Sequence, residues 1–309
     1  MWIYSIKTNT CDKATVLHFG SGLIGHAIWE CLGKVDNRIL QNEKTPYYWG
    51  AEDEKIEESW TGIFGKVKGL NTKELHVIWA AGKAGFSADE ETTQKELLHF
   101  KKAISLIQKA VSNQSIEAHF YFMGSAGGMH EGVKMVQSND QISLQRPYGR
   151  LKNAQEGVLK AATEFKSITL FRISSVYSHN NIKGRLGLIA VLVKNGIANA
   201  VSNIFGAEST LRDYVLDDDI AKCQYQQMMQ KNKKGVEITY LIDGKPSSLT
   251  EIRHMVERVL GKKLYLKYSL EKNNATDITF SSHLRSPLFR SSTLYTNIKM
   301  LHQNLLKGN

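Results

Sequence analysis

The chain has 309 residues, of which 42% are hydrophobic and 23% are charged. This length and apolar content allow a sizeable core, which excludes intrinsic disorder, and the length predicts about two domains. Lys and Arg outnumber Asp and Glu by 40 to 30, but no Arg/Lys-rich arm or aromatic-interleaved basic stripe occurs, so the sequence argues against a nucleic-acid partner.

The first half of the chain alternates short apolar runs with longer amphipathic segments. Short apolar runs predict strands, and apolar residues at helical spacing predict helices. In chain order the predicted elements are a strand at Ala14–Phe19, a helix at Leu23–Leu32, a weak strand around Arg38–Gln41, a strand at His76–Ala80, a helix at Glu90–Val111, a strand at Ala118–Met123, a helix at Tyr148–Phe165 and a strand at Ser167–Ile173. This alternation predicts right-handed βαβ units and a parallel sheet.

The character of the sequence changes after about Val176, where Asn, Gly and Ser become frequent. Val236–Ile242 predicts a late strand that returns to the sheet. Ser248 and Glu251 form a capping-box pattern that predicts a helix running to Leu260. We therefore predict an α/β fold, a Rossmann-like doubly wound parallel sheet with a small C-terminal substrate-binding lobe. The predicted Rossmann domain comprises residues 1–179 and 215–243, and the predicted lobe comprises residues 180–214 and 244–309.

A Gly-x-Gly-x-x-Gly pattern directly follows the strand Ala14–Phe19 and opens the next helix. Gly20 can make the tight turn, Gly22 lets the backbone approach a pyrophosphate, and Gly25 permits close packing of helix on strand. The helix N-terminus adds hydrogen-bond donors and a positive potential. The pattern predicts a dinucleotide cofactor, NAD or NADP, and the alternative is a glycine-rich turn without a ligand.

An acidic residue about 20 positions further along the chain holds the adenosine ribose in sites of this kind. Glu43, close to the end of the weak second strand, is the nearest candidate. Lys44 and Arg38 lie beside it in the sequence and would instead receive a 2′-phosphate. The choice between NAD and NADP stays open at this point, and a plain surface charge is the alternative for each of the three residues.

A tyrosine, a lysine and a serine form the candidate catalytic set. Tyr148 and Lys152 are four residues apart and therefore lie on one face of the predicted helix. An ammonium group nearby stabilises a phenolate, so the tyrosine can exchange protons with an alcohol or a carbonyl. Ser125 follows the strand Ala118–Met123, at the edge where open α/β sheets bind ligands. A solvated helix face and a turn-forming serine are the alternatives, but the order of the three residues after the glycine loop favours a catalytic site.

These motifs together resemble the extended short-chain dehydrogenase/reductase family, in its NAD-dependent epimerase/dehydratase group that acts on nucleotide sugars. The stretches that are similar to family segments are Val77–Ala81, Tyr148–Glu156, Leu170–Tyr177 and Arg212–Ala221. The resemblance implies that Ala80 and Ala81 line the cofactor and that Arg212 contacts the diphosphate of a nucleotide-sugar substrate. Residues 142–213 contain ten Lys and Arg residues but four Asp and Glu residues, and this excess of positive charge agrees with an anionic substrate.

The sequence departs from the family pattern at three places. Phe19 stands at the first glycine of the usual Gly-x-x-Gly-x-x-Gly, with Gly20 supplying a different one. Gly124 precedes Ser125, where the family commonly has a pair of serines. No residue of Glu96–Lys102 matches the asparagine that the family often has in this helix. These departures affect details of the cofactor site more than the fold.

The residues after Ser125 reduce the number of reactions that the sequence allows. Family dehydratases have an Asp-Glu pair there, whereas this chain has Ala126 and Gly127, which cannot act as acid or base. The cysteine of the 3,5-epimerase/reductases is also absent from this turn. His130 and His179 are interpreted as surface or packed residues. Two reactions remain, 4-keto reduction and C4 epimerisation, and the small C-terminal lobe slightly favours a reductase.

A non-catalytic NAD(P) sensor of the same fold is the alternative function, although a sensor has no need of a proton relay.

The cysteines share no metal-ligand or redox spacing, which favours thiols in a reducing compartment. Met1–Thr10 does not resemble a signal peptide, and apolar runs such as Leu186–Val193 fall short of the ~20 residues that span a bilayer. We therefore expect a cytoplasmic protein without a metal or a membrane partner, and a homodimer is compatible with the sequence. The cysteines are Cys11, Cys31 and Cys223.

Overall fold

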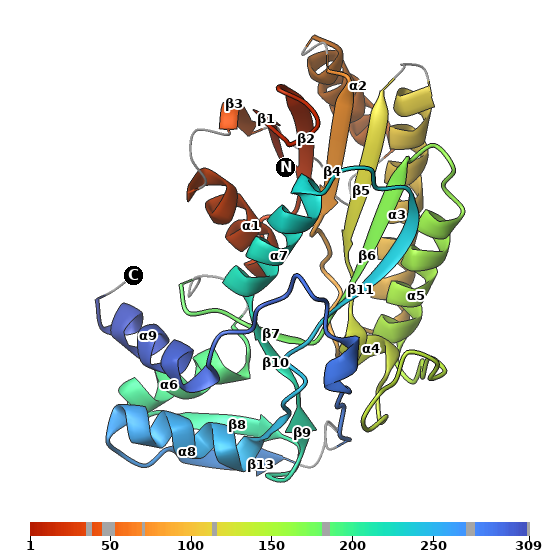
Figure 1. The fold of residues 1–309 in the computed structure, drawn as a ribbon. Coiled ribbons are helices and arrows are strands. Elements are labelled where there is room, and N and C mark those ends of the chain that lie inside the picture. Colours follow the sequence, from red (N-terminus) through yellow and green to blue (C-terminus); the bar gives the residue numbers. More distant parts are fainter. Residues whose placement is uncertain are drawn as a thin grey trace. The chain divides into compact units, whose positions relative to one another are not determined.

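The computed structural model of the chain describes residues 1–34, 39–44, 53–69, 72–112, 116–180, 186–269 and 276–307. These form two compact units, drawn with their elements labelled in Figure 1. The first unit comprises Met1–Met129, Leu144–Arg172 and Gln224–Thr239. The second unit comprises His130–Ser143, Ile173–Cys223 and Tyr240–Asn309.

A seven-stranded sheet organises the first unit, with the strand order β11-β6-β5-β4-β2-β1-β3. The strands are β1 (Trp2–Ile6), β2 (Ala14–Phe19), β3 (Ile39–Lys44), β4 (Glu74–Trp79), β5 (Glu117–Met123), β6 (Ser167–Ile173) and β11 (Gly235–Leu241). The pairs β2–β4, β4–β5 and β5–β6 are parallel. The predicted Rossmann-like parallel sheet is therefore confirmed, and its central strands are buried along nearly their whole length. One face of these strands is apolar, whereas the other also carries buried polar side chains such as His76 and His119.

Strand β1 has no counterpart in the sequence prediction, and it changes the order of the sheet. It runs antiparallel to both of its neighbours, with Trp2 opposite His18 of β2 on one side and opposite Lys44 of β3 on the other. In the common doubly wound order the second βαβ strand lies directly beside the glycine-loop strand. Here β3 lies two strand positions from β2, because β1 is inserted between them.

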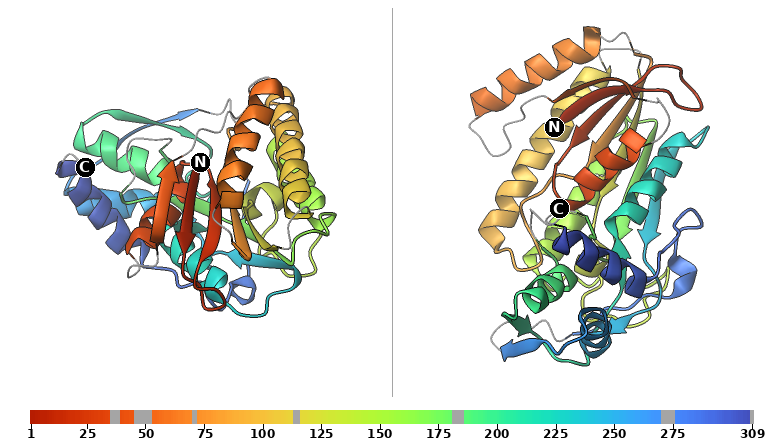
Figure 2. Two further views of the ribbon diagram at one scale, coloured as in Figure 1. Left: turned by 90° about the horizontal axis from the view of Figure 1, so that it is seen from above. Right: turned by 90° about the vertical axis from the view of Figure 1, so that its left-hand side faces the viewer.

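Helices cover both faces of this sheet. Their bounds are α1 (Leu23–Lys34), α2 (Asp53–Gly69), α3 (Glu90–Ser112), α4 (Ala126–Met129) and α5 (Pro147–Lys160). Side chains of α2, α3 and α5 pack on one face, whereas Trp29 of α1 stacks on Trp2 of β1 on the other. Helices α2 and α3 run beside each other (Figure 2), and Lys102 Nζ lies 3.7 Å from Glu57 Oε1 across that contact. Helix α5 ends five residues before its predicted end, because Phe165 instead packs into the core against Phe120.

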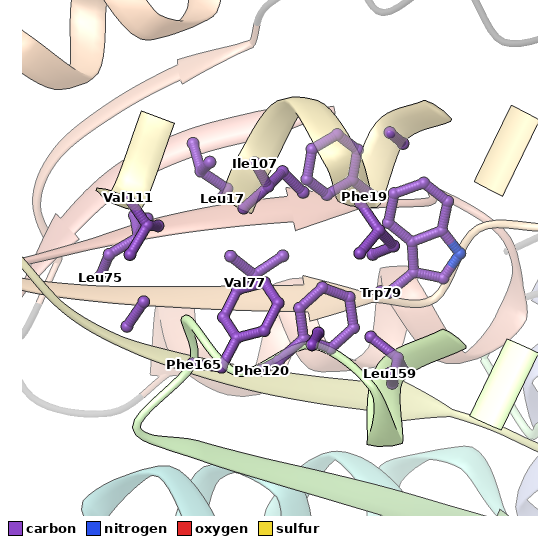
Figure 3. Packing of buried hydrophobic residues seen from close by; sticks show 14 of the residues in the cluster. Leu17, Phe19, Leu75, Val77, Trp79, Ile107, Val111, Phe120, Leu159 and Phe165 are labelled. Atoms are coloured by element: carbon purple, nitrogen blue, oxygen red, sulfur yellow. The ribbon is translucent and has the colours of Figure 1, made fainter. Parts of the chain in front are cut away.

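The core of the first unit is built from β2, β4 and β5 and the helices on one face (Figure 3). Leu17 and Val77 of the strands meet Ile107 of α3, and the rings of Phe19 and Trp79 stack with centroids 4.8 Å apart. Full burial of one such side chain contributes about 1.5–3 kcal/mol. The cluster therefore fixes the carboxyl ends of these strands, where the predicted site residues follow.

A buried ion pair ties α5 to β6. Arg172 donates from Nε to Glu156 Oε1 at 3.0 Å and from Nη2 to Glu156 Oε2 at 2.9 Å. This two-point geometry is the strongest form of a charge-assisted hydrogen bond in proteins. Because α5 also carries Tyr148 and Lys152, the ion pair fixes the helix that presents them.

The second unit has a separate core formed by α6 (Leu188–Ile197), α8 (Leu249–Leu260) and α9 (Leu294–Leu306). Three short strand pairs belong to this unit: β7 (Ser175–Tyr177) with β10 (Tyr214–Leu216), β8 (Val201–Phe205) with β13 (Tyr265–Ser269), and β9 (Leu211–Arg212) with β12 (Ser247–Ser248). The predicted capping box is confirmed, since Ser248 Oγ accepts the Glu251 N–H at 3.1 Å and the Ser248 N–H donates to Glu251 Oε2 at 2.7 Å. The remaining helix α7 (Asp217–Met229) runs from this unit into the first, and a short 3₁₀ turn η1 spans Ser282–Leu284.

The observed units differ from the predicted domain boundaries in four segments, of which residues 130–143, in the second unit, are the longest. The Val136 N–H donates to the Thr279 carbonyl at 3.0 Å, and the Ser281 N–H donates back to the Val136 carbonyl at 3.0 Å. These bonds join segments far apart in the sequence, so no local pattern indicates them. The segments 173–179, 215–223 and 240–243 likewise belong to the second unit.

Candidate active site

The glycine loop connects β2 to α1 at the carboxyl end of β2. Gly20 has φ +100°, and a Cβ there would overlap the Ala80 carbonyl. A Cβ on Gly25 would overlap the Gly20 carbonyl, so both positions require glycine for the fold itself. Gly22 differs, because no described atom lies within 4 Å of the place its Cβ would take. Its exposed backbone at the start of α1 fits the approach of a pyrophosphate.

The second predicted cofactor segment meets the first. Ala80 and Ala81 directly follow β4, and the Ala80 N–H donates to the Phe19 carbonyl at 2.8 Å. The place of a Gly20 Cβ also lies only 2.7 Å from the Ala81 nitrogen. The loops after the adjacent strands β2 and β4 thus form one continuous edge. Their residues fit a dinucleotide, whose phosphates need main-chain N–H donors and close backbone approach.

The structure brings the three predicted catalytic residues together. Ser125 follows β5, and its Oγ accepts the Gly128 N–H at 3.0 Å. A Cβ on Gly128 would lie 2.9 Å from Tyr148 Cδ1 and 3.3 Å from Ser125 Oγ, so hydroxyl and ring border the same glycine. Lys152 lies one turn further along α5, with Nζ 5.7 Å from the centroid of the Tyr148 ring. The Ser125 hydroxyl, the Tyr148 ring and the Lys152 ammonium group therefore lie close together.

The departure at Gly124 has a physical reason. A Cβ there would lie 2.9 Å from the Phe171 carbonyl oxygen, which also accepts the Gly124 N–H at 2.8 Å. The close approach of β5 to β6 at this point leaves no room for the serine that the family often has. Ser125 alone therefore supplies the hydroxyl of this turn.

Two polar residues around Lys152 were not predicted from the sequence. The lysine is only 5% exposed, and its Nζ donates to Gln155 Oε1 at 3.1 Å and lies over the Phe122 ring at 5.3 Å. Glu96 Oε1 lies 3.9 Å from the same Nζ. A signal existed in the sequence, because Glu96 occupies the apolar stripe of α3 between Thr93 and Phe100, where a charged residue is unusual.

The predicted ribose residue has a different setting. Glu43 is the penultimate residue of β3, where its Cα pairs with Ile3 of β1. β1 thus separates Glu43 from the glycine-loop strand, whereas the predicted contact assumes neighbouring strands. Arg38 lies outside the described residues. The role of Glu43 in holding the ribose stays a prediction. The prediction assumes that β3 lies directly beside β2, which is not the case in this sheet.

Arg212 lies in the second unit, half-buried at the end of β9. Its Nη1 donates to the Leu211 carbonyl at 3.0 Å and to the Thr276 carbonyl. Asp277 accepts the Leu211 N–H, and this hydrogen bond together with Lys134 lowers the pKa of that carboxyl. Main-chain carbonyls therefore orient the guanidinium of Arg212.

The two histidines that the sequence leaves as surface or packed residues are both buried. His130 Nε2 lies 3.1 Å from the Tyr240 hydroxyl, and His179 Nε2 lies 3.8 Å from an Asp218 carboxylate oxygen. Within the described ranges, no group of three His, Cys, Asp or Glu residues is arranged to hold a metal ion. No helix in those ranges is long and apolar enough to cross a membrane.

The parallel sheet and the glycine loop after β2 define a Rossmann-like dinucleotide-binding fold. The family described as the NAD dependent epimerase/dehydratase family matches residues 20–242, and the chain belongs to this family. The predicted family is therefore confirmed, and with it the class of cofactor.

A named relative agrees with this placement. A Methanocaldococcus jannaschii protein named "Putative UDP-glucose 4-epimerase" is 29% identical over 129 residues, which are 41% of this chain and 41% of that protein. The chain thus matches less than half the length of that relative.

Solved structures show the same fold over nearly the whole chain. The Thermotoga maritima UDP-glucose 4-epimerase with UDP-glucose has a TM-score of 0.72 at 14% identity, covering 95% of this chain and 98% of that one. The Thermus thermophilus UDP-glucose 4-epimerase with NAD has a TM-score of 0.70 at 15% identity, covering 95% and 99%. The Bacillus cereus UDP-glucuronic acid 4-epimerase with UDP-glucuronic acid and NAD has a TM-score of 0.69 at 15% identity, covering 93% and 97%.

Proposed function

We propose that this protein is an NAD-dependent enzyme acting at C4 of a nucleotide sugar, and that its reaction is C4 epimerisation. The observation that carries the proposal is the placement of Ser125 and Tyr148 against the same glycine, with Lys152 buried beside the Tyr148 ring. The bound cofactor supplies a hydride acceptor and donor. The protein then needs only to orient the sugar hydroxyl and to move its proton.

Each of the three residues has a distinct role in this proposal. Ser125 Oγ hydrogen-bonds the reacting C4 oxygen, and the Tyr148 phenolate takes its proton as general base. Lys152 stabilises the phenolate through its positive charge, because a nearby opposite charge favours the ionised form. The return of the proton from Tyr148 completes the cycle when the intermediate ketone is reduced on its other face.

The surroundings of Ser125 argue against elimination chemistry. Ala126 and Gly127 follow it in α4, and neither can donate or accept a proton with its side chain. The 4-epimerase names of the relatives support epimerisation over simple 4-keto reduction. A reductase would use the same residues, so the two reactions are separated by assay.

The decisive experiment is a turnover assay with Tyr148→Phe, which removes the acid/base hydroxyl and keeps the ring. Turnover should fall by roughly 10²–10⁴-fold. Lys152→Met should also lose activity. Near-full turnover in Tyr148→Phe would contradict the catalytic assignment.

The substrate screen covers UDP-, dTDP-, GDP- and CDP-sugars together with their 4-keto forms. An epimerase interconverts two alcohols with no net change in cofactor, whereas a reductase consumes NADH in proportion to ketone. If no nucleotide sugar turns over or raises the melting temperature, the substrate class is wrong and only the dinucleotide fold remains.

Arg212 is proposed to meet the diphosphate of the substrate with charge-assisted hydrogen bonds. Arg212→Lys keeps the charge but loses the planar fork, so KM for the sugar nucleotide should rise about tenfold while kcat changes little. Because Arg212 also holds main-chain carbonyls, the melting temperature of the variant is the control. An unchanged KM in a folded variant would mean that Arg212 has only a structural role.

A further inference from the structure

Glu96 is a carboxylate in a place where burial is costly. It lies on the face of α3 that packs into the first unit, and only 3% of its surface is exposed. Burying a carboxylate without partners is strongly unfavourable, so such groups are retained where charges or donors compensate them. The contacts of its two oxygens show what it does.

One oxygen holds the loop that follows Ala80 and Ala81. Glu96 Oε2 accepts the main-chain N–H groups of Lys83 and Ala84, each at 2.8 Å. These two charge-assisted hydrogen bonds fix the loop at the proposed cofactor edge.

The other oxygen faces the catalytic lysine. Glu96 Oε1 is 3.9 Å from Lys152 Nζ and has no hydrogen-bond partner among the described residues. A Cβ on Gly82 would lie 2.8 Å from it, so this oxygen lies close against the backbone of the loop. An ammonium has three N–H donors, and Gln155 accepts one of them from Lys152. The carboxylate therefore acts on Lys152 mainly as a negative charge at close range.

We propose that Glu96 is a positioning residue that anchors the loop after β4 and partly neutralises Lys152, and so sets the pH at which Tyr148 works. The inference rests on the proposed function of Tyr148 and Lys152. The phenolate is stabilised by the ammonium of Lys152, and a carboxylate 3.9 Å from that ammonium weakens this stabilisation. Removal of the Glu96 charge should therefore favour the phenolate and shift activity to lower pH.

The groups that contact this pair come from α3, α5, β5 and the loop after β4. Within the described part of the first unit, α3 contributes Glu96 and α5 contributes Lys152 and Tyr148 itself. β5 presents the uncharged Phe122 ring to Lys152, and the loop after β4 presents Phe86 to Tyr148 at 6.4 Å between ring centroids. The guanidinium of Arg146 lies over the Phe86 ring, with Cζ 4.4 Å from the ring centroid.

The test compares Glu96→Gln, Glu96→Ala and the matched control Glu90→Gln. Gln keeps an oxygen for the two loop N–H groups but carries no charge, whereas Ala loses both. Glu90 lies on the same helix and is exposed, with Oε2 paired to Arg150 at 2.7 Å instead of to Lys152. Each variant is measured for its kcat–pH profile and for its Kd for NAD.

We expect the rising limb of the Glu96→Gln profile to move by about one pH unit toward acid, the lower end of the effect of one nearby charge. Its Kd for NAD should stay within about twofold of the wild type, whereas the Kd of Glu96→Ala should rise about tenfold as the loop loosens. A Glu96→Gln profile that superimposes on the wild type, or an equal shift in Glu90→Gln, would overturn the inference.

A second readout needs no turnover. Ultraviolet titration of tyrosinate, taken as the difference between proteins with and without Tyr148→Phe, reports the ionisation of Tyr148 alone. The Glu96→Gln background should move that ionisation toward acid by the same amount, and an unchanged titration would overturn the inference. Failure of the proposed function shows itself differently, as full activity in Tyr148→Phe whatever residue stands at position 96.

Discussion

Gly22→Val tests the cofactor site without breaking the fold. Gly22 directly precedes α1, and its carbonyl accepts the His26 N–H at 2.8 Å, a bond that a valine backbone also makes. Since no described atom lies within 4 Å of the new Cβ, this Cβ meets no steric clash inside the protein. The free energy of unfolding should change by no more than about 1 kcal/mol, which is the usual cost of an unfavourable residue at a helix start. Gly20 and Gly25 cannot serve here, because a side chain at either would collide with backbone.

The effect on binding should be much larger than the effect on stability. A branched side chain at Gly22 occupies the space through which a pyrophosphate approaches the helix start. Each hydrogen bond to a charged phosphate contributes about 1.5–3 kcal/mol, so the loss of one or two amounts to about 3 kcal/mol. This corresponds to a rise in Kd of roughly 100-fold.

The assay is calorimetric titration of cofactor-free protein with NAD and with NADP, alongside thermal melting without cofactor. Gly33→Val is the matched control, because Gly33 lies on the same helix, is exposed and also has no described atom within 4 Å of its Cβ position. The control should bind like the wild type. A Gly22→Val protein whose Kd lies within threefold of the wild type would refute the assignment of this loop to the cofactor. The two titrations also decide between NAD and NADP.

Three other variants each test a single feature of the structure. Because β1 separates Glu43 from the glycine-loop strand, Glu43→Gln should change the calorimetric Kd for NAD by less than twofold, and a tenfold loss would show that the ribose contact forms across β1. Glu156→Ala leaves Arg172 buried without its carboxylate, so urea denaturation should show a loss of about 3–5 kcal/mol, and a loss below 1 kcal/mol would contradict the role given to this ion pair. Burial raises the pKa of Asp217 to about 7, so its folded form retains a proton that the unfolded chain releases near pH 4. Stability from this group is therefore complete below about pH 4 and is lost as pH rises through 7, and Asp217→Asn should melt at a higher temperature than the wild type at pH 8 but not at pH 4.

Elements with a local signature could be predicted from the sequence alone. The glycine loop, the helix cap at Ser248 and the pair Tyr148–Lys152 each depend on residues a few positions apart. At such short separations, backbone geometry decides which groups meet. Patterns of this kind, with the strand–helix alternation, were sufficient to predict the parallel sheet and the closeness of Tyr148 to Lys152.

Only the tertiary structure decided how distant segments pair. β1 is a short mixed segment whose place between β2 and β3 depends on main-chain hydrogen bonds to both, and such bonds leave no periodic trace in the sequence. The transfer of residues 130–143 to the second unit depends on bonds to residues 279–281 in the same way. The position of Glu96 beside Lys152 likewise depends on packing, because Glu96 lies on α3 and Lys152 on α5, and the two groups meet only when these helices pack together. Chain-local propensity cannot specify these contacts, since their free energy arises only when separate elements are brought together.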